Sequence, residues 1–393
     1  MSLDVPAVQA ALRASRLDGW LLYDFHGSNP VSRRVAGLAT TGHMTTRRWF
    51  YLVPAKGEPR KLVHKIEKRT LAHLPGHAVE YAGRVELEAG LRQILGGCRT
   101  IAMEYSPHAA IPYVSRVDAG TVELVRDCGT TIVSSGDLVQ EFEAMWPAGG
   151  FDTHRAASSA LYRIKDRAFA LIAARLREGT ATNEFDIQSA MMTWFDEEGL
   201  TTDAAPIVAS QENSGDPHYQ PTAASARPIG PNEVVLLDLW GKLKTPQAVY
   251  ADISWMGFTG ASIPAPVEAA FAAVRDARDA AVALVESAAA AGRDVRGYEA
   301  DGAARAVLQA AGFGGAILHR TGHSLGEEVH GNGAHLDDYE TKDERRLLPG
   351  TGFTIEPGLY FDTFGVRTEI NIAWGPTGPE VTGPRQNAVV PLV

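Results

Sequence analysis

The chain has 393 residues, which is enough for two or three domains, and its 45% hydrophobic and 21% charged residues are ordinary for a globular protein. The formal net charge of −10 and the lack of a Lys/Arg-rich run exclude nucleic acid and anionic membrane surfaces as expected partners. With two cysteines, no signal-peptide pattern at the N-terminus and no apolar run of about 18 residues, we expect a cytoplasmic protein with reduced thiols and no membrane span.

Residues 1–150 are expected to form one α/β domain. Strand-like runs occur at 19–23, 48–53, 61–64, 79–81 and 100–104. Helical segments lie between these runs, and such alternation predicts a mixed or parallel sheet with helices on its faces. No glycine-rich phosphate loop follows the runs, which argues against a nucleotide site. A linker is predicted at 147–150, where proline and glycine gather.

Residues 151–393 are expected to form a second domain, in which two helices are followed by strands, twice over. The helical periodicity predicts helices at 154–178, 183–198, 266–291 and 298–311. Two apolar, β-prone runs lie between the helical pairs, and three more follow the last helix. The runs are at 234–241, 250–254, 319–326, 353–358 and 366–372.

Each of these five runs carries one group that is costly to bury without a partner. The groups are Asp238, Asp252, His323, Glu356 and Glu369. A lone carboxylate inside a sheet loses several kcal/mol of solvation unless something neutralises it. Four carboxylates cannot neutralise one another, so only cations can hold them together if they converge, with His323 completing the set. The pattern therefore predicts a dinuclear metal site.

Taken one at a time, the same residues have simpler explanations. Asp238 and Asp252 are each typical of an aspartate that serves a turn at a strand end. His323 is typical of a turn histidine, and Glu369 of a cross-strand ion pair on a solvated face. A hairpin between the two aspartates would place both side chains on one face of adjacent strands, which favours the metal site.

The order of the groups, Asp, Asp, His, Glu-Pro-Gly and Arg-x-Glu, resembles that of the pita-bread-fold metallopeptidases (family M24). These are methionine aminopeptidase, aminopeptidase P and prolidase, with creatinase as a metal-free relative. The resemblance covers about residues 155–393, and residues 1–150 resemble, more loosely, the N-terminal domain of prolidase and aminopeptidase P. It implies an α/β (α+β) fold, with a creatinase-like α/β N-terminal domain (1–150) followed by a pita-bread catalytic domain (151–393).

By that resemblance, five residues hold two divalent metal ions. Asp252 and Glu369 bridge both ions, Asp238 holds one of them, and His323 with Glu356 holds the other. A set of four carboxylates and one imidazole suits Mn, Co, Zn or Fe(II), and ligand type does not choose among them. One departure from the family is that the loop between the two aspartates is longer than usual.

The resemblance also assigns residues to catalysis and substrate binding. His218 and His330 match histidines that meet the substrate near the scissile bond, and Arg367 matches the arginine of the Arg-x-Glu element. Glu356 would accept the proton of the attacking water and pass it to the leaving amine, while Arg367 would fix the carboxylate that it faces. In a second departure, Ser324 stands where these enzymes usually have glycine.

The activity implied by the resemblance is that of a Xaa-Pro dipeptidase (prolidase), which hydrolyses the peptide bond before proline by a metal-bridging hydroxide. The alternatives are aminopeptidase P, which acts on longer peptides, a non-catalytic pita-bread binding module, and a metal-free creatinase-like hydrolase. The expected partners are a small peptide with proline after the scissile bond and a second copy of the chain in a homodimer. Arg47 and Arg48 are candidates to meet a dipeptide's C-terminal carboxylate, although a solvated strand end explains them more simply.

Overall fold

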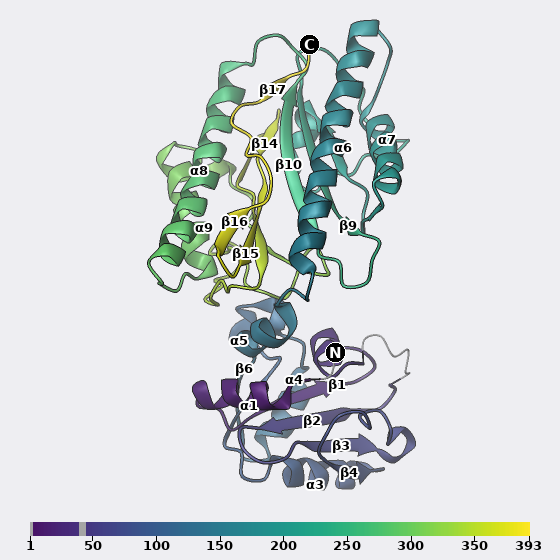
Figure 1. The fold of residues 1–393 in the computed structure, drawn as a ribbon, viewed down its shortest axis with the longest axis vertical. Helices are drawn as coiled ribbons and strands as arrows, with labels where there is room; N and C mark the ends of the chain where they lie inside the picture. Colours follow the sequence, from purple (N-terminus) through teal and green to yellow (C-terminus); the bar gives the residue numbers. More distant parts are fainter. Residues whose placement is uncertain (1–2, 39–44) are drawn as a thin grey trace. The chain divides into compact units, whose positions relative to one another are not determined.

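The computed structural model describes residues 3–38 and 45–393. The chain divides between Ala144 and Met145 into two compact units (Figure 1). None of the helices in the described residues is both long and apolar enough to cross a membrane. Cys98 and Cys128 are free and half-buried, and burial raises the pKa of both thiols.

The first unit is built on a six-stranded mixed sheet in the order β4-β3-β2-β1-β5-β6. Its strands are β1 (Gly19–Asp24), β2 (Trp49–Pro54), β3 (Arg60–His64), β4 (His77–Tyr81), β5 (Thr100–Met103) and β6 (Thr131–Ser134). The β1–β2 and β2–β3 pairs are antiparallel, and the other pairs are parallel. The mixed sheet expected from the alternation is confirmed. Strand β6 escaped prediction because only one of its four residues, Ile132, is buried.

Helices cover both faces of this sheet. They are α1 (Val5–Ala14), α2 (Pro30–Val35), α3 (Arg84–Leu95), α4 (Ala119–Arg126) and α5 (Gly136–Val139), with a π-helical turn (Gln140–Ala144) after α5. Alternate residues of β1 enter two separate cores, with Trp20 packing among residues of α1, α2 and α5 and Leu21 among residues of α3 and α4. All six residues of β1 are therefore buried, as expected for a strand with a helical layer on each side.

The second unit contains α6 (Gly150–Glu178), α7 (Glu184–Glu197), α8 (Ala265–Ala290) and α9 (Gly297–Ala310). One sheet has the order β17-β10-β9-β7, with β8 also paired to β9; another has the order β11-β12-β15-β16; β13 and β14 form a separate pair. The strands are β7 (Leu200–Thr201), β8 (Ile207–Ser210), β9 (Val234–Leu243), β10 (Ala251–Phe258), β11 (Ser324–Leu325), β12 (Gly352–Ile355), β13 (Gly358–Tyr360), β14 (Gly365–Arg367), β15 (Ile370–Gly375), β16 (Gly378–Val381) and β17 (Val390–Pro391). Helix α6 begins four residues before its predicted start, with Gly149 as N-cap at a φ of 80°. The end of the predicted linker thus belongs to the helix.

The long antiparallel hairpin β9–β10 separates two layers of this unit. Odd-numbered side chains of both strands, such as Leu237 and Ile253, pack against α6 and α7. Even-numbered side chains, such as Leu236 and Met256, join the core that contains α8, α9 and the sheet with β12 and β15 (Figure 1). The hairpin therefore presents one alternating row of side chains to the second sheet, and the candidate site lies in that row.

Candidate metal centre

The β9–β10 hairpin places two carboxylates and a hydroxyl on one face. Asp238 lies opposite Ser254 in the register, and Asp252 lies opposite Trp240. Since 252 and 254 are two residues apart in a strand, Asp238, Asp252 and Ser254 share the face that points away from α6. All three are buried, with exposed fractions of 8%, 5% and 0%. The hairpin predicted from the spacing of the two aspartates is confirmed.

The opposing sheet supplies an imidazole and two further carboxylates. His323 directly precedes β11, and its N–H donates to Thr354 Oγ1 at 3.0 Å, while the Thr354 N–H donates to the His323 carbonyl at 2.8 Å. Gly322 permits this close approach, because a Cβ there would lie 2.1 Å from the Thr354 carbonyl oxygen. Glu356 follows β12. Glu369 directly precedes β15, and its N–H donates to the Ser254 carbonyl at 3.3 Å, which ties it to the hairpin.

Three of the predicted ligands converge in the buried interior. Asp252, His323 and Glu369 each offer one ligand atom, and these atoms all lie within 4.8 Å of one another. His323 Nε2 is 3.6 Å from Asp252 Oδ2 and 3.4 Å from Glu356 Oε1. Asp252 Oδ1 and Glu369 Oε1 are buried and have no hydrogen-bond partner among the described residues. Buried oxygens without a donor are costly, and a hard cation is the partner that this donor set fits.

The protonation states of the isolated protein reflect this crowding of carboxylates. Burial, followed by the charges of neighbouring carboxylates, raises the pKa of Asp252 and of Glu369 well above the usual range. Burial also raises the pKa of Glu356 to about 7, and it lowers the pKa of His323 well below the usual range. The site therefore disfavours uncompensated negative charge while keeping the imidazole neutral, which is the form that binds a metal.

Asp238 lies beside this group and is satisfied by protein donors. Arg367 Nη2 donates to Asp238 Oδ2 at 2.5 Å, and Ser254 Oγ lies 3.0 Å from Asp238 Oδ1. Arg367, in β14, thus faces a predicted ligand carboxylate, and burial of both groups favours a firm pair. The ligand role of Asp238 stays a prediction, since both of its oxygens are hydrogen-bonded.

Three polar residues of this network escaped the sequence analysis. Ser254 Oγ lies 2.8 Å from Glu369 Oε2 and accepts from Arg367 Nε at 2.8 Å, so it links the carboxylates to the guanidinium. The Tyr360 hydroxyl accepts from Arg367 Nη1 at 3.0 Å and lies 2.7 Å from His319 Nε2. Burial lowers the pKa of His319 to about 3, so this histidine is neutral. Ser254 was detectable as the residue two positions after Asp252 on the same face, whereas no local signal marks Tyr360 or His319.

The two predicted substrate-facing histidines lie on irregular segments of the second unit. The His330 ring packs edge-on against His323, with 4.4 Å between ring centroids. Burial is the main cause that lowers the pKa of His330, and the charges of Arg320 and His218 act in the same direction. His218 follows the 3-10 helix η5 (Gln211–Gly215), and both histidines keep exposed surface. Their substrate roles stay predictions.

A buried carboxylate that the sequence analysis missed organises the segment around His218. Glu184, at the start of α7, is fully buried and accepts from the Ser210 N–H at 2.7 Å and from the Arg227 N–H at 2.8 Å. Tyr219, the neighbour of His218, donates its hydroxyl to Glu184 at 2.6 Å, and the side chain of Asn213 in η5 also donates to it. One carboxylate thus joins α7, β8, η5 and the residue after His218.

Comparison with known proteins places this geometry in context. The model of metallopeptidase family M24 matches residues 157–374. The chain is 31% identical over 171 residues to a Xaa-Pro dipeptidase of Lactobacillus delbrueckii subsp. lactis, a match that spans 43% of this chain and 42% of that protein's length. It is 25% identical over 326 residues to the probable dipeptidase PepE of Mycobacterium tuberculosis (strain ATCC 25618 / H37Rv), which spans 81% of this chain and 78% of that protein.

Solved structures share the whole fold. Dipeptidase PepE from Mycobacterium ulcerans superposes over 100% of both chains with a TM-score of 0.72 and 21% identity. A prolidase from Thermococcus sibiricus covers 98% of both chains with a TM-score of 0.63 and 19% identity. The predicted fold class, a creatinase-like α/β domain followed by a pita-bread domain, is confirmed.

Proposed function

The chain belongs to metallopeptidase family M24, and on that premise we propose that it is a dinuclear metal-dependent Xaa-Pro dipeptidase. The proposal rests above all on the two orphaned oxygens of Asp252 and Glu369 beside the neutral imidazole of His323. It is supported by the similarity to a Xaa-Pro dipeptidase and to probable dipeptidases. We propose further that residues 1–150 form its N-terminal domain and residues 151–393 its catalytic domain.

We assign the metal-ligand role to five residues: Asp238, Asp252, His323, Glu356 and Glu369. When bound there, two divalent ions, with Mn, Co or Zn as candidates, lower the pKa of water and polarise the scissile carbonyl. Burial that disfavours the free carboxylates makes a cation the natural counterpart of this cluster.

The remaining roles fall to residues around the carboxylates. We assign to Glu356 the role of taking a proton from the attacking water and delivering it to the leaving nitrogen. We propose that His218 and His330 hydrogen-bond the substrate near the scissile bond. Arg367 holds Asp238 through the hydrogen bond between them and contacts Ser254 and Tyr360, which keeps the carboxylate oriented.

The test is an assay of metal-reconstituted protein with Ala-Pro and Ala-Pro-Ala. We expect proline release from Ala-Pro and little cleavage of the tripeptide. Preferential cleavage of Ala-Pro-Ala would instead identify an aminopeptidase P. No cleavage of either peptide, together with no metal in the purified protein, would favour a binding module and overturn the proposal. We also propose that the protein is cytoplasmic and that it forms a homodimer. Sedimentation of the purified protein tests the homodimer independently.

A further inference from the structure

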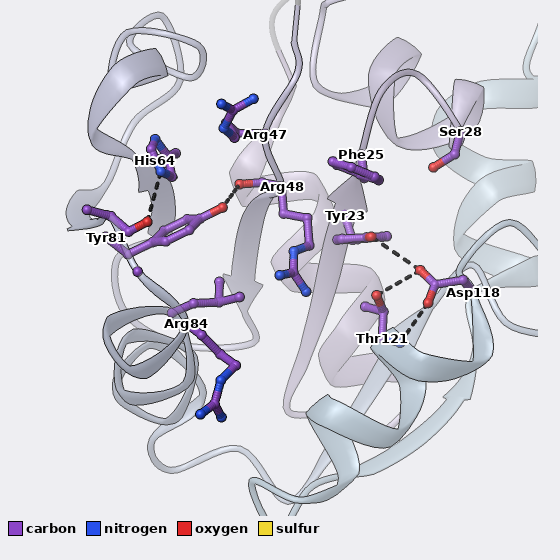
Figure 2. Close-up of a pocket in the computed structure, with 13 residues that line it drawn as sticks. Tyr23, Phe25, Ser28, Arg47, Arg48, His64, Tyr81, Arg84, Asp118 and Thr121 are labelled. Atoms are coloured by element: carbon purple, nitrogen blue, oxygen red, sulfur yellow. Dashed lines mark hydrogen bonds between the residues drawn. The ribbon is translucent and has the colours of Figure 1, made fainter.

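The first unit contains an open cavity of about 680 Å³, and none of the residues assigned to catalysis belongs to its lining. It forms where β1, β3 and β4 end, where β2 begins and where α3 and α4 start (Figure 2). Two tyrosines, Tyr23 and Tyr81, form part of its lining, together with Arg47, Arg48 and Arg84. The cavity is therefore both aromatic and cationic.

Arg48 gives this cavity a positive charge that forms no ion pair with a described residue. Its side chain is half-buried and extends into the cavity between Tyr23 and Tyr81 (Figure 2). No hydrogen bond or ion pair joins its guanidinium to any described residue, whereas Arg84 pairs with Glu88 at 2.8 Å. Arg48 directly precedes β2, and its half-buried side chain forms part of the lining of the open cavity.

Among the described residues that line the cavity, the one acid, Asp118, is already engaged. Asp118 Oδ2 accepts from the hydroxyls of Tyr23 at 3.2 Å and Thr121 at 2.8 Å, and Oδ1 accepts from the Thr121 N–H at 2.9 Å. Desolvation acts to raise the pKa of Asp118, but these hydrogen bonds prevail and lower it. Asp118 therefore serves as the N-cap of α4 and orients Tyr23, and it forms no direct ion pair with Arg48.

The walls of the cavity are held in place before any ligand arrives. The Tyr81 hydroxyl donates to the Arg48 carbonyl at 2.7 Å, and the N–H groups of Thr46 and Arg47 donate to Glu67 at 2.8 and 3.1 Å. Burial raises the pKa of Tyr23 to about 12, and the charge of Arg48 opposes this rise without reversing it. Tyr23 thus stays neutral, and the positive charge of Arg48 acts on its hydroxyl group.

We propose that this cavity binds a small organic anion, whose carboxylate or phosphate pairs with Arg48 and whose apolar part lies against the aromatic wall of the cavity. Arginine presents a planar fork of donors that matches both kinds of anion, and an aromatic wall favours a flat apolar group beside it. The proposal concerns the first unit alone and does not rest on the peptidase activity.

The probes are phenyl phosphate, benzoate and the uncharged analogue benzyl alcohol, titrated calorimetrically into the metal-loaded full-length protein. We expect at least one anion to bind saturably, with an affinity that falls as salt is added, and benzyl alcohol to bind far more weakly. Arg48→Gln should weaken anion binding by about tenfold or more, because a charge-assisted hydrogen-bonded pair is lost. Arg48→Lys, which keeps the charge without the fork, should restore part of it.

The matched control is Arg92→Gln, which removes the same charge from an exposed position of α3 outside the cavity lining. It should leave the affinity within about twofold of the parent. An anion that binds at the metal centre instead would keep its full affinity in the Arg48→Gln protein. The proposal would be overturned by that result, by an equal loss of anion affinity in the Arg48 and Arg92 variants, by binding of benzyl alcohol as tight as that of the anions, or by no binding of either anion.

Discussion

Replacement of Glu369 by Gln tests the metal centre most directly. Glu369 is 1% exposed, its Oε1 has no partner among the described residues, and its Oε2 lies 2.8 Å from Ser254 Oγ. Gln has nearly the same shape but carries no charge. Since burial and the charge of Asp252 raise the pKa of Glu369 well above its usual range, the metal-free variant should be at least as stable as the parent at pH 8.

The metal-loaded forms should differ in the opposite direction. A divalent ion at about 100 times its Kd stabilises a one-site protein by about 2.7 kcal/mol. The second unit spans 393 − 145 + 1 = 249 residues, and for a domain of that size about 1 kcal/mol shifts Tm by about 2–4 °C. The parent should therefore gain about 5–11 °C in Tm on metal addition. Glu369→Gln should lose most of that gain, together with peptidase activity.

The assay is thermal unfolding at pH 8, in chelator and in Mn(II), with the metal content measured in parallel. Glu268→Gln is the matched control, because Glu268 is an exposed residue in the first turn of α8. This control should keep the full metal-dependent shift. A Glu369→Gln protein that is less stable without metal and still shows the whole shift would refute the reasoning, since Glu369 would then be a structural residue and not a ligand.

Three further predictions follow from the same geometry. In metal-free protein, the free energy of unfolding measured in urea should fall by about 3 kcal/mol as pH rises from 4.5 to 7. Burial raises the pKa of Glu356 from 4.5 to about 7, so over this range the folded protein keeps a proton that the unfolded chain has lost; a flat profile would contradict this. Glu184→Gln should lower the free energy of unfolding by about 2–4 kcal/mol and raise KM, because it disorders the segment that carries His218. Glu212→Gln, which removes an exposed ion pair in the same segment, should lower the free energy of unfolding by less than about 0.5 kcal/mol. Equal urea midpoints for the two variants would contradict this prediction. Gly322→Ala should lower the free energy of unfolding by about 1–3 kcal/mol and reduce the metal content, because the added Cβ clashes with the Thr354 carbonyl. Gly326→Ala, whose added Cβ meets nothing within 4 Å, should change neither the free energy of unfolding nor the metal content.

The sequence predicts most of the fold because its local patterns are strong. Continuous apolar runs such as 19–23 and 234–237 are typical of strands covered on both sides, and the structure places them so. The start of α6 was misplaced because Gly149 and Gly150 resemble a linker, yet a glycine at positive φ is also a suitable N-cap. Short strands such as β6 carry too few buried residues to stand out.

A residue of the candidate site was predictable only where its side chain is costly to bury and its position in an apolar run indicates that it is buried. Asp252 lies in an apolar strand and Glu369 directly precedes one, so the sequence indicates that both are buried and that each needs a positively charged partner. Glu184 lies in a helix start, where an acidic residue is ordinary, and its role depends on donors up to 43 residues away. Tyr360 is likewise defined by Arg367 and His319, which only the folded chain brings together.

The contrast between Asp238 and its neighbours indicates how the proposed pair of ions would be accommodated. Asp252 and Glu369 each keep a buried oxygen without a partner, so they can accept a cation without losing a protein contact. Asp238 has no such oxygen, because Arg367 and Ser254 hold both of them. Each carboxylate oxygen has a second lone pair, so Asp238 can bind a cation while Arg367 keeps its hydrogen bond to Oδ2. It follows that Asp252, His323 and Glu369 can accept a cation with the least rearrangement, and that Arg367 would orient Asp238 toward the second ion of the proposed pair.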